Sequence, residues 1–366
     1  MTAWVHEASS IGDGGEPGGS KPNSEPPQIA TIRLGDQVSD IVTSPNNSVA
    51  YAALSNSIAV ISSVHDVSCV IPISGHPSSL AIDPDGSRLY ANNYGGSVSV
   101  INIADHRVDV IPDTCCVQQV DTVDGPLIYA AGNAKDGGRC GGLISVIDAG
   151  GATVAAIAGL DGYAITDLAA DPEGNRVYVG LSQQSTYYQY DAGVLGVIDT
   201  ATNAAIHTID VGASPDTITV SPDGSMMYTT HYDHKLVSAV DLGSYHVTPI
   251  ALGDRPLGVS LTPDGLQGYV ANRWSLSVID TVTNEAAGIA VGDLPRCVRI
   301  SPDGKLAYAS NFGDRSVSVI DTIAQCVTDT IDVGGHPEAL AVSSDGHRLY
   351  VGDYWSGAVS VFSVQP

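Results

Sequence analysis

Two histidines occupy matching places before a repeated turn in this sequence, and two carboxylates lie in the same unit as one of them. His76 and His336 each lie ten residues before the glycine of that turn. Glu338 and Asp353 follow His336 in its unit, and Asn93 has the place in the His76 unit that Asp353 has in the other. Imidazole titrates near neutral pH and a carboxylate can orient it, so such a group could bind a divalent cation or act in acid–base catalysis. The alternative is that Gly-His-Pro only begins a strand and the histidines stack on a rim.

Tyrosines form a second group, in two variable segments. They are Tyr187, Tyr188 and Tyr190 in SQQSTYYQYDAG and Tyr232 in HYDHK. Tyrosine offers a large amphipathic contact surface at a small cost in conformational entropy, which favours binding of a ligand or protein. A loop folded over its own strands would explain the same residues. His231 and His234 flank Tyr232 without a third metal ligand, so we expect no metal site there.

An internal repeat of eight units places these residues. SPDGKLAYASN…SVSVIDT, which begins at Ser301, is among the clearest copies. The turn glycines are Gly86, Gly125, Gly174, Gly224, Gly265, Gly304 and Gly346, with Asn47 in the equivalent place of the first unit. Successive turns lie 39 to 50 residues apart. This period is typical of propeller blades.

Each unit divides into four strands. A short apolar run meets the Pro-Asp-Gly turn, where proline presets φ and glycine accepts a positive φ. The last unit stops after its third strand, whereas residues 28–35 resemble an unpaired fourth strand. We therefore expect an all-β, eight-bladed β-propeller in which this N-terminal strand pairs with residues 358–364 and closes the ring. Seven blades are the alternative if the degenerate first unit or the irregular third unit forms no blade.

The loops on one face of such a ring surround the mouth of the central channel. Function favours that face because its loops vary on a fixed scaffold. The candidate ligand-binding residues there are Asn93, Asn272, Asn311, His231 and Arg255, together with Tyr187, Tyr188, Tyr190 and Tyr232. The candidate catalytic residues are His76, His336, Glu338 and Asp353.

The repeat motifs resemble those of a known family. YxxN after a PDG turn, with VxVIDT and TIxVGxxP, resembles the YVTN-repeat propellers, which include the YncE-like proteins, and is similar to cytoplasmic lactonase and virginiamycin-lyase-type propellers. The resemblance covers about residues 28–363 and implies the fold. It implies little about function, because the motif residues form turns and pack blade cores. Members commonly have seven blades, so eight would be a departure from the family.

Composition excludes several classes of function. The chain has 366 residues, with 40 acidic and 15 basic side chains and a net charge of −25, so a nucleic-acid backbone would be repelled. No apolar run is long enough to span a membrane. Residues 1–27 are rich in Gly, Pro, Ser and Glu, and we expect a disordered leader followed by a propeller domain at 28–366. Without a secretory signal we expect a cytoplasmic monomer, with export through a missed or processed leader as the alternative.

The six cysteines divide into two sets. Cys69, Cys297 and Cys326 fall on strands too far apart for a disulfide. Cys115, Cys116 and Cys140 share one blade and one face. One of the first two could bond Cys140, or all of these thiols could be free.

Two functions follow from these patterns. The leading interpretation is a non-catalytic binding or scaffold propeller that needs no cofactor and engages a small molecule or a protein partner on the channel-mouth face. The alternative is a lactonase-like hydrolase or a metal-assisted lyase that uses the histidines and carboxylates named above. Geometry separates them, because catalysis requires these groups to converge on one pocket.

Overall fold

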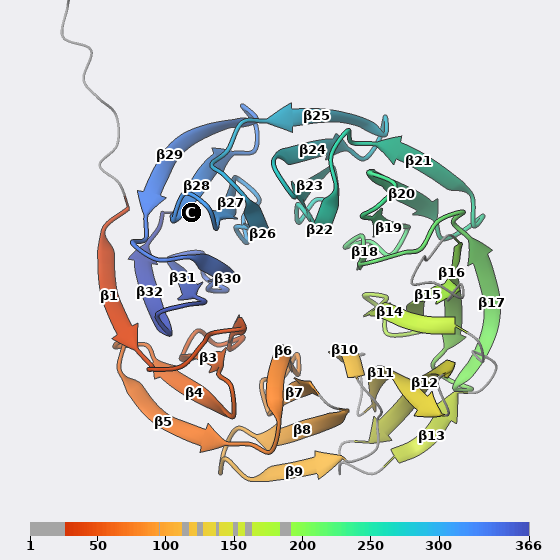
Figure 1. Cartoon of the computed structure of the whole chain (residues 1–366), viewed down its shortest axis with the longest axis horizontal. Helices are drawn as coiled ribbons and strands as arrows, with labels where there is room; N and C mark the ends of the chain where they lie inside the picture. Colours follow the sequence, from red (N-terminus) through yellow and green to blue (C-terminus); the bar gives the residue numbers. More distant parts are fainter. Residues whose placement is uncertain are drawn as a thin grey trace, which may run out of the picture.

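The protein is an eight-bladed β-propeller, as expected. The computed structural model describes residues 26–94, 96–111, 117–122, 127–136, 139–148, 153–157, 163–183 and 192–365. Within these residues, thirty-two strands form eight four-stranded antiparallel sheets arranged as a ring (Figure 1). The first and third units both form complete sheets, so the count is eight and not seven.

The blades are numbered here in chain order, each from its innermost to its outermost strand. Blades 1 to 4 consist of β2 (Asp40–Thr43), β3 (Val49–Ala53), β4 (Ser57–Ser62) and β5 (Val67–Pro72); β6 (His76–Ile82), β7 (Arg88–Tyr94), β8 (Ser97–Asn102) and β9 (Val108–Ile111); β10 (Val117–Thr122), β11 (Leu127–Asp136), β12 (Arg139–Asp148) and β13 (Thr153–Ile157); and β14 (Tyr163–Ala170), β15 (Arg176–Gln183), β16 (Gly193–Asp199) and β17 (Ala204–Asp210). Blades 5 to 8 consist of β18 (Ile218–Val220), β19 (Met226–His231), β20 (Leu236–Asp241) and β21 (Val247–Ala251); β22 (Pro256–Leu261), β23 (Gln267–Asn272), β24 (Leu276–Asp280) and β25 (Glu285–Ile289); β26 (Pro295–Ile300), β27 (Leu306–Asn311), β28 (Ser316–Asp321) and β29 (Cys326–Asp332); and β30 (Pro337–Val342), β31 (Arg348–Asp353), β32 (Ala358–Ser363) and β1 (Gln28–Arg33).

The N-terminal strand closes the ring. β1 pairs antiparallel with β32, with Thr31 opposite Ser360 and Arg33 opposite Ala358. The amide of Ser363 also donates to the carbonyl of Pro27. Blade 8 is therefore built from both ends of the chain, and the predicted pairing is confirmed.

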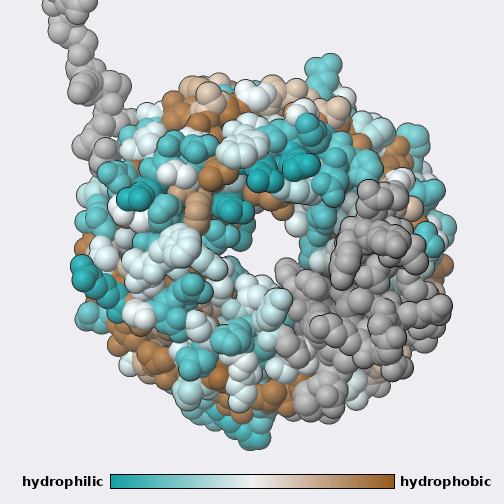
Figure 2. Space-filling view, in the orientation of Figure 1, coloured by the Kyte–Doolittle hydropathy of each residue, from teal (hydrophilic) through white to brown (hydrophobic). Residues whose placement is uncertain are grey.

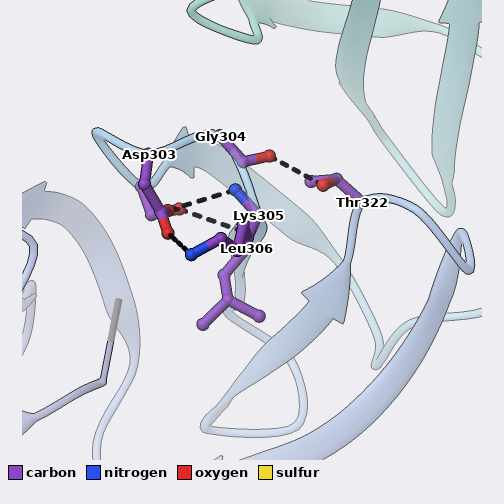
Figure 3. A network of polar contacts seen from close by, with 6 residues as sticks. Asp303, Gly304, Lys305, Leu306 and Thr322 are labelled. Carbon is purple, nitrogen blue, oxygen red and sulfur yellow. Dashed lines mark hydrogen bonds and ion pairs between the residues drawn. The ribbon is translucent and has the colours of Figure 1, made fainter.

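The Pro-Asp-Gly turns have the backbone that their residues favour. Gly304 has φ +76°, and Asn47, which replaces glycine in the first unit, has φ +57°. Figure 3 shows the turn of blade 7, where Asp303 accepts hydrogen bonds from the amide of Lys305 and pairs with its ammonium group at 2.7 Å. The hydroxyl of Thr322, at the end of β28, donates to the carbonyl of Gly304 at 2.7 Å. The turn is thus tied to the strand that returns beside it.

The core lies between adjacent blades. The repeat tyrosine is at most 2% exposed in every blade; the eight are Tyr51, Tyr90, Tyr129, Tyr178, Tyr228, Tyr269, Tyr308 and Tyr350. In one typical layer, Tyr269 of blade 6 packs with Ala307 and Ile320 of blade 7. Each sheet therefore buries both faces against its neighbours, which explains the near-continuous buried runs of the second and third strands, such as β27 and β28.

Polar bonds join the innermost strands around the channel. The carboxylate of Asp40 in blade 1 accepts from the amide of Leu80 in blade 2 at 2.8 Å, and Asp167 in blade 4 accepts from Ile218 in blade 5 at 2.7 Å. Across the closure, the hydroxyl of Thr43 donates to the carbonyl of Val342 in blade 8. Figure 2 shows that the centre of the ring stays open.

Two sequence-based expectations concern cysteines and membrane spans. Cys69, Cys297 and Cys326 are free thiols, as expected. Cys115 and Cys116 lie outside the described residues, as does the side chain of Cys140, so the disulfide alternative stays a prediction. Within the described ranges, there is no helix of a length and apolar character that would cross a membrane.

Candidate functional site on the channel-mouth face

The ring has two faces made by different loops. On the turn face lie the Pro-Asp-Gly turns and the connections from third to fourth strands. On the mouth face lie the loops from second to third strands and the loops that enter each blade from the one before. In blades 1 and 5 to 8 these two mouth loops are held to each other by hydrogen bonds of one aspartate per blade.

We call these aspartates the loop staples. They are Asp36, Asp216, Asp254, Asp314 and Asp353, in blades 1, 5, 6, 7 and 8. Asp254 in the entering loop of blade 6 accepts from the amide of Trp274 at 2.9 Å and the hydroxyl of Ser275 at 3.1 Å. Asp36 bonds the amide and hydroxyl of Ser55, Asp216 the amide of Tyr232, Asp314 the amide of Asp293, and Asp353 the amide of His336. The loops are therefore fixed before any ligand arrives.

Burial and hydrogen bonding move the pKa values of the staples in different directions. The hydroxyl of Ser55 is the main reason that the pKa of Asp36 is lowered. Partial burial alone would raise the pKa of Asp353, but hydrogen bonds from Ser356 and from loop amides outweigh it and lower the pKa. Burial raises the pKa of Asp216 despite the amide of Tyr232. The pKa of a staple is therefore lowered where hydrogen-bond donors surround its carboxylate, because they stabilise the charged form.

Three arginines lie over aromatic rings on the mouth face of blades 5 to 7. Arg255 lies 5.1 Å from the ring centroid of Tyr232, Arg273 lies 5.3 Å from that of Trp274, and Arg296 lies 5.2 Å from that of Phe312. Arg273 also donates to the hydroxyl of Tyr232 at 2.9 Å. These distances are those of cation–π pairs. We call this group, with Trp355 of blade 8, the arginine–aromatic rim.

The rim is open to solvent. Trp274 is 58% exposed and Trp355 is 65% exposed, and they are the two tryptophans among the described residues. Tyr94, in the corresponding loop of blade 2, is 82% exposed. Large aromatic side chains that are exposed to solvent on one face of a protein mark interaction surfaces. They are also the residue types, with arginine, that dominate binding energy at protein interfaces.

The structure separates the four candidate catalytic residues by role. Asp353 is a staple, and the Nδ1 atom of His336 bonds the carbonyl of Phe312 at 2.8 Å, with the two rings 4.8 Å apart. Glu338 faces Arg296 at 4.0 Å; burial raises the pKa of this carboxyl and Arg296 opposes the rise. His76 is exposed on blade 2, and it makes a small contribution to the lowered pKa of Asp36. Among the described contacts, His76 makes no hydrogen bond or ion pair with the other three.

The candidate ligand-binding asparagines are internal. Asn93, Asn272 and Asn311 are at most 1% exposed, and each Nδ2 donates to two serine hydroxyls, in or just before the third strand, at 2.9 to 3.2 Å. His231 fills this place in blade 5, with Nε2 against the hydroxyl of Ser238 and Nδ1 against the carbonyl of Ser214, both at 2.9 Å. Burial lowers the pKa of His231, which favours the neutral ring. These four side chains pin the second strand to the third and are inaccessible to a ligand in this structure.

Arg255 and Tyr232 are the candidate ligand-binding residues that the structure brings together on the surface. Tyr187, Tyr188 and Tyr190 lie outside the described residues. Sequence reasoning missed Trp274, Trp355, Phe312, Arg273 and Arg296. A signal existed, because Phe312 and Tyr232 immediately follow Asn311 and His231, two of the predicted ligand-binding residues.

A polar groove extends the mouth face outward along blade 8. It encloses about 630 Å³ and is lined by Arg33, Asp332, Asp353, Ser356 and neighbouring residues. Its two aspartates do not make a metal site on their own. Within the described part of the chain, no three His, Cys, Asp or Glu side chains are grouped to hold a metal ion.

Comparison with known proteins supports the fold. No protein-family model matches the chain. It is 30% identical over 265 residues to the seven-bladed beta-propeller protein Rv1057 of Mycobacterium tuberculosis, a match that covers 59% of this chain and 63% of that protein. The chain is a β-propeller protein. Its structure also resembles Kuenenia stuttgartiensis hydrazine synthase, with a TM-score of 0.61, 18% identity, and 91% and 96% of the two chains covered, a likeness that concerns the fold alone.

Proposed function

We propose that this propeller is a non-catalytic scaffold that binds a protein partner on its mouth face, through the arginine–aromatic rim of blades 5 to 8. A β-propeller fold supports binding roles in general, and the rim offers the exposed aromatic and arginine side chains that such a role would use. Trp274 and Trp355 are exposed in the second-to-third loops of blades 6 and 8, on either side of blade 7. The observation that supports this proposal most directly is the presence of two exposed tryptophans on the same face as three arginines that stack on aromatic rings.

Preorganisation supports binding over catalysis. The staples hold the loops that carry Trp274 and Trp355, so little ordering entropy remains to be lost on association. The same bonds occupy the carboxylates that a hydrolase or lyase would need, notably Asp353. Glu338 lies 4.0 Å from Arg296 and could take part in acid–base chemistry. His336, however, is hydrogen-bonded through Nδ1 to the carbonyl of Phe312. The enzyme alternative would require these groups to reorganise.

Two finer assignments belong to the same proposal. Tyr187, Tyr188 and Tyr190 lie in the connection between β15 and β16, which joins a second strand to a third, and would extend the binding surface toward blade 4. The repeat motifs favour membership of the YVTN-repeat, YncE-like group, in which eight blades would be unusual.

Paired alanine substitutions test the proposal. The variant Trp274→Ala/Trp355→Ala should lose partners that the wild-type protein retains from an extract of its own organism, and affinity for any purified partner should fall by about tenfold or more. The matched control is Leu266→Ala/Ile323→Ala, two apolar residues of the turn face that are 53% and 86% exposed. The control should bind like the wild type, and both variants should keep the wild-type melting temperature. Equal retention of partners by all three proteins would refute the proposed surface.

A further inference from the structure

A second pocket lies on the other side of the ring, where the residues before β1 meet those after β32. It encloses about 390 Å³ between blades 7 and 8. Leu306, Tyr308 and Val319 of blade 7 form one wall, and Val364 with Pro27 forms part of the other. Asp329 of β29 also lines it and is the one charged residue among its described lining. Pockets of this size accommodate small organic molecules.

Tyr308 lines this pocket, and its buried hydroxyl has no hydrogen-bond partner. Tyr308 is 1% exposed, and its Oη atom makes no hydrogen bond. In blade 3 the matching hydroxyl of Tyr129 donates to Asn203 of the next blade at 2.7 Å, and in blade 6 that of Tyr269 donates to the carbonyl of Thr322 at 3.3 Å. Tyr228 of blade 5 also lacks a hydrogen bond, but its hydroxyl lies beside Thr281 of the next blade.

The segment of blade 8 beside this pocket differs from the equivalent segment of blade 7. Val364 takes the place in blade 8 that Thr322 has in blade 7, since the amides of both bond the residue after the turn glycine, His347 and Lys305. Valine has no hydroxyl to bond the turn. No third-to-fourth connection follows it, because β1 supplies the fourth strand. A buried polar group that lacks its partner is a point at which a ligand can supply one.

We propose that this closure pocket binds a small amine with an apolar body, such as an arylalkylamine. The leucine, valine and proline side chains suit the apolar body. The hydroxyl of Tyr308 can accept a hydrogen bond from the ammonium group, and Asp329 gives the pocket a negative charge that favours a cation over an anion. This site lies away from the rim and does not depend on the proposed partner.

Calorimetric titration of the full chain with 2-phenylethylamine tests the assignment, and 3-phenylpropionate serves as the anionic probe of similar shape. Wild-type protein should bind the amine and not the carboxylate. Tyr308→Phe should weaken amine binding by roughly fivefold to tenfold, because one hydrogen bond is lost. Asp329→Asn should weaken it as well and reduce its dependence on salt.

Tyr269→Phe is the matched control, since it removes the same hydroxyl from blade 6. It should bind the amine like the wild type but melt at a lower temperature, because its hydroxyl has a protein partner. Tyr308→Phe should keep the wild-type melting temperature. Absence of amine binding, equal binding of the two probes, or unchanged affinity in Tyr308→Phe would overturn the proposal.

Discussion

Aspartates on the turn face accept hydrogen bonds from residues close in the sequence, whereas those on the mouth face accept them from residues far away in the sequence. Asp264, in the turn of blade 6, accepts from the hydroxyl of Thr262 and the amide of Leu266, each two residues away. Asp254, on the mouth face of the same blade, accepts from the amide of Trp274, twenty residues away. The turn face repeats one local structure in blade after blade, whereas the mouth face joins loops that differ in each blade. We therefore expect the local structure of the turn face to contribute most to stability, and the loop contacts of the mouth face to determine the shape of a binding surface.

The largest expected effect is on the turn face. Gly304 has φ +76°, and a Cβ there would lie 3.1 Å from Cδ of Pro263. Gly304→Val should lower the free energy of unfolding by about 2 kcal/mol or more, because valine is strained at positive φ. Urea denaturation measures the loss.

Gly288→Val is the control for this substitution. Gly288 lies on the exposed outer strand β25, with open space around its Cβ position. Valine there should leave stability unchanged or raise it. If Gly304→Val also weakened partner binding as strongly as the rim variants, the separation between the two faces would be wrong.

Removal of a loop staple should have an intermediate effect on stability. Asp254→Ala leaves the amide of Trp274 and the hydroxyl of Ser275 without their acceptor, so the free energy of unfolding should fall by about 1 kcal/mol. Partner affinity should fall as well, since the loop of Trp274 becomes mobile. Denaturation and binding assays on the same preparation measure both.

Asp233→Ala is the matched control on the mouth face. Asp233 is 81% exposed and pairs with Arg255 at 3.8 Å, so its removal should change stability by less than about 0.5 kcal/mol. A staple variant that behaved like this control would show that the mouth loops do not need their aspartates.

The smallest expected effect is the pH dependence of the turn face. Hydrogen bonds from Lys305 and then Ser301 lower the pKa of Asp303 to about 2, below the value of about 3.9 in an unfolded chain. A lowered pKa in the folded state means that this stabilisation is complete above about pH 5 and is lost as the pH falls toward 2. Denaturation curves between pH 6 and pH 2 should show a falling acid limb.

Asp303→Asn isolates this contribution. At pH 6 the variant should be less stable by about 0.5 to 1 kcal/mol, a modest figure because the pair with Lys305 is partly screened by solvent. The difference from the wild type should shrink as the pH approaches 2. A difference that stayed constant with pH would assign the effect to the change of side chain and not to its charge.

Local signals made the fold predictable from the sequence. The recurring turn, with glycine in seven of the eight units, predicted the blades, and the missing fourth strand of the last unit predicted the closure of β1 on β32. The turn aspartates follow the same rule, since they bond residues two positions away.

The site was less predictable because its interactions have no fixed register. The staple lies in the entering loop for Asp36, Asp216 and Asp254, in the second-to-third loop for Asp314, and at the end of the second strand for Asp353. Aligning the repeats therefore does not reveal it. Alignment also drew attention to Asn93, Asn272 and Asn311, which point inward, while the exposed rings come one or two residues later.

The pairing of β1 with β32 has a consequence for how the protein is made. Gln28 and Ser360, which contact each other across this pair, are 332 residues apart. At ordinary rates of translation, the first strand leaves the ribosome roughly 20 to 60 seconds before its partner is synthesised. During that interval the growing chain is an open arc with two unpaired edges, and only completion of synthesis allows it to become a circle.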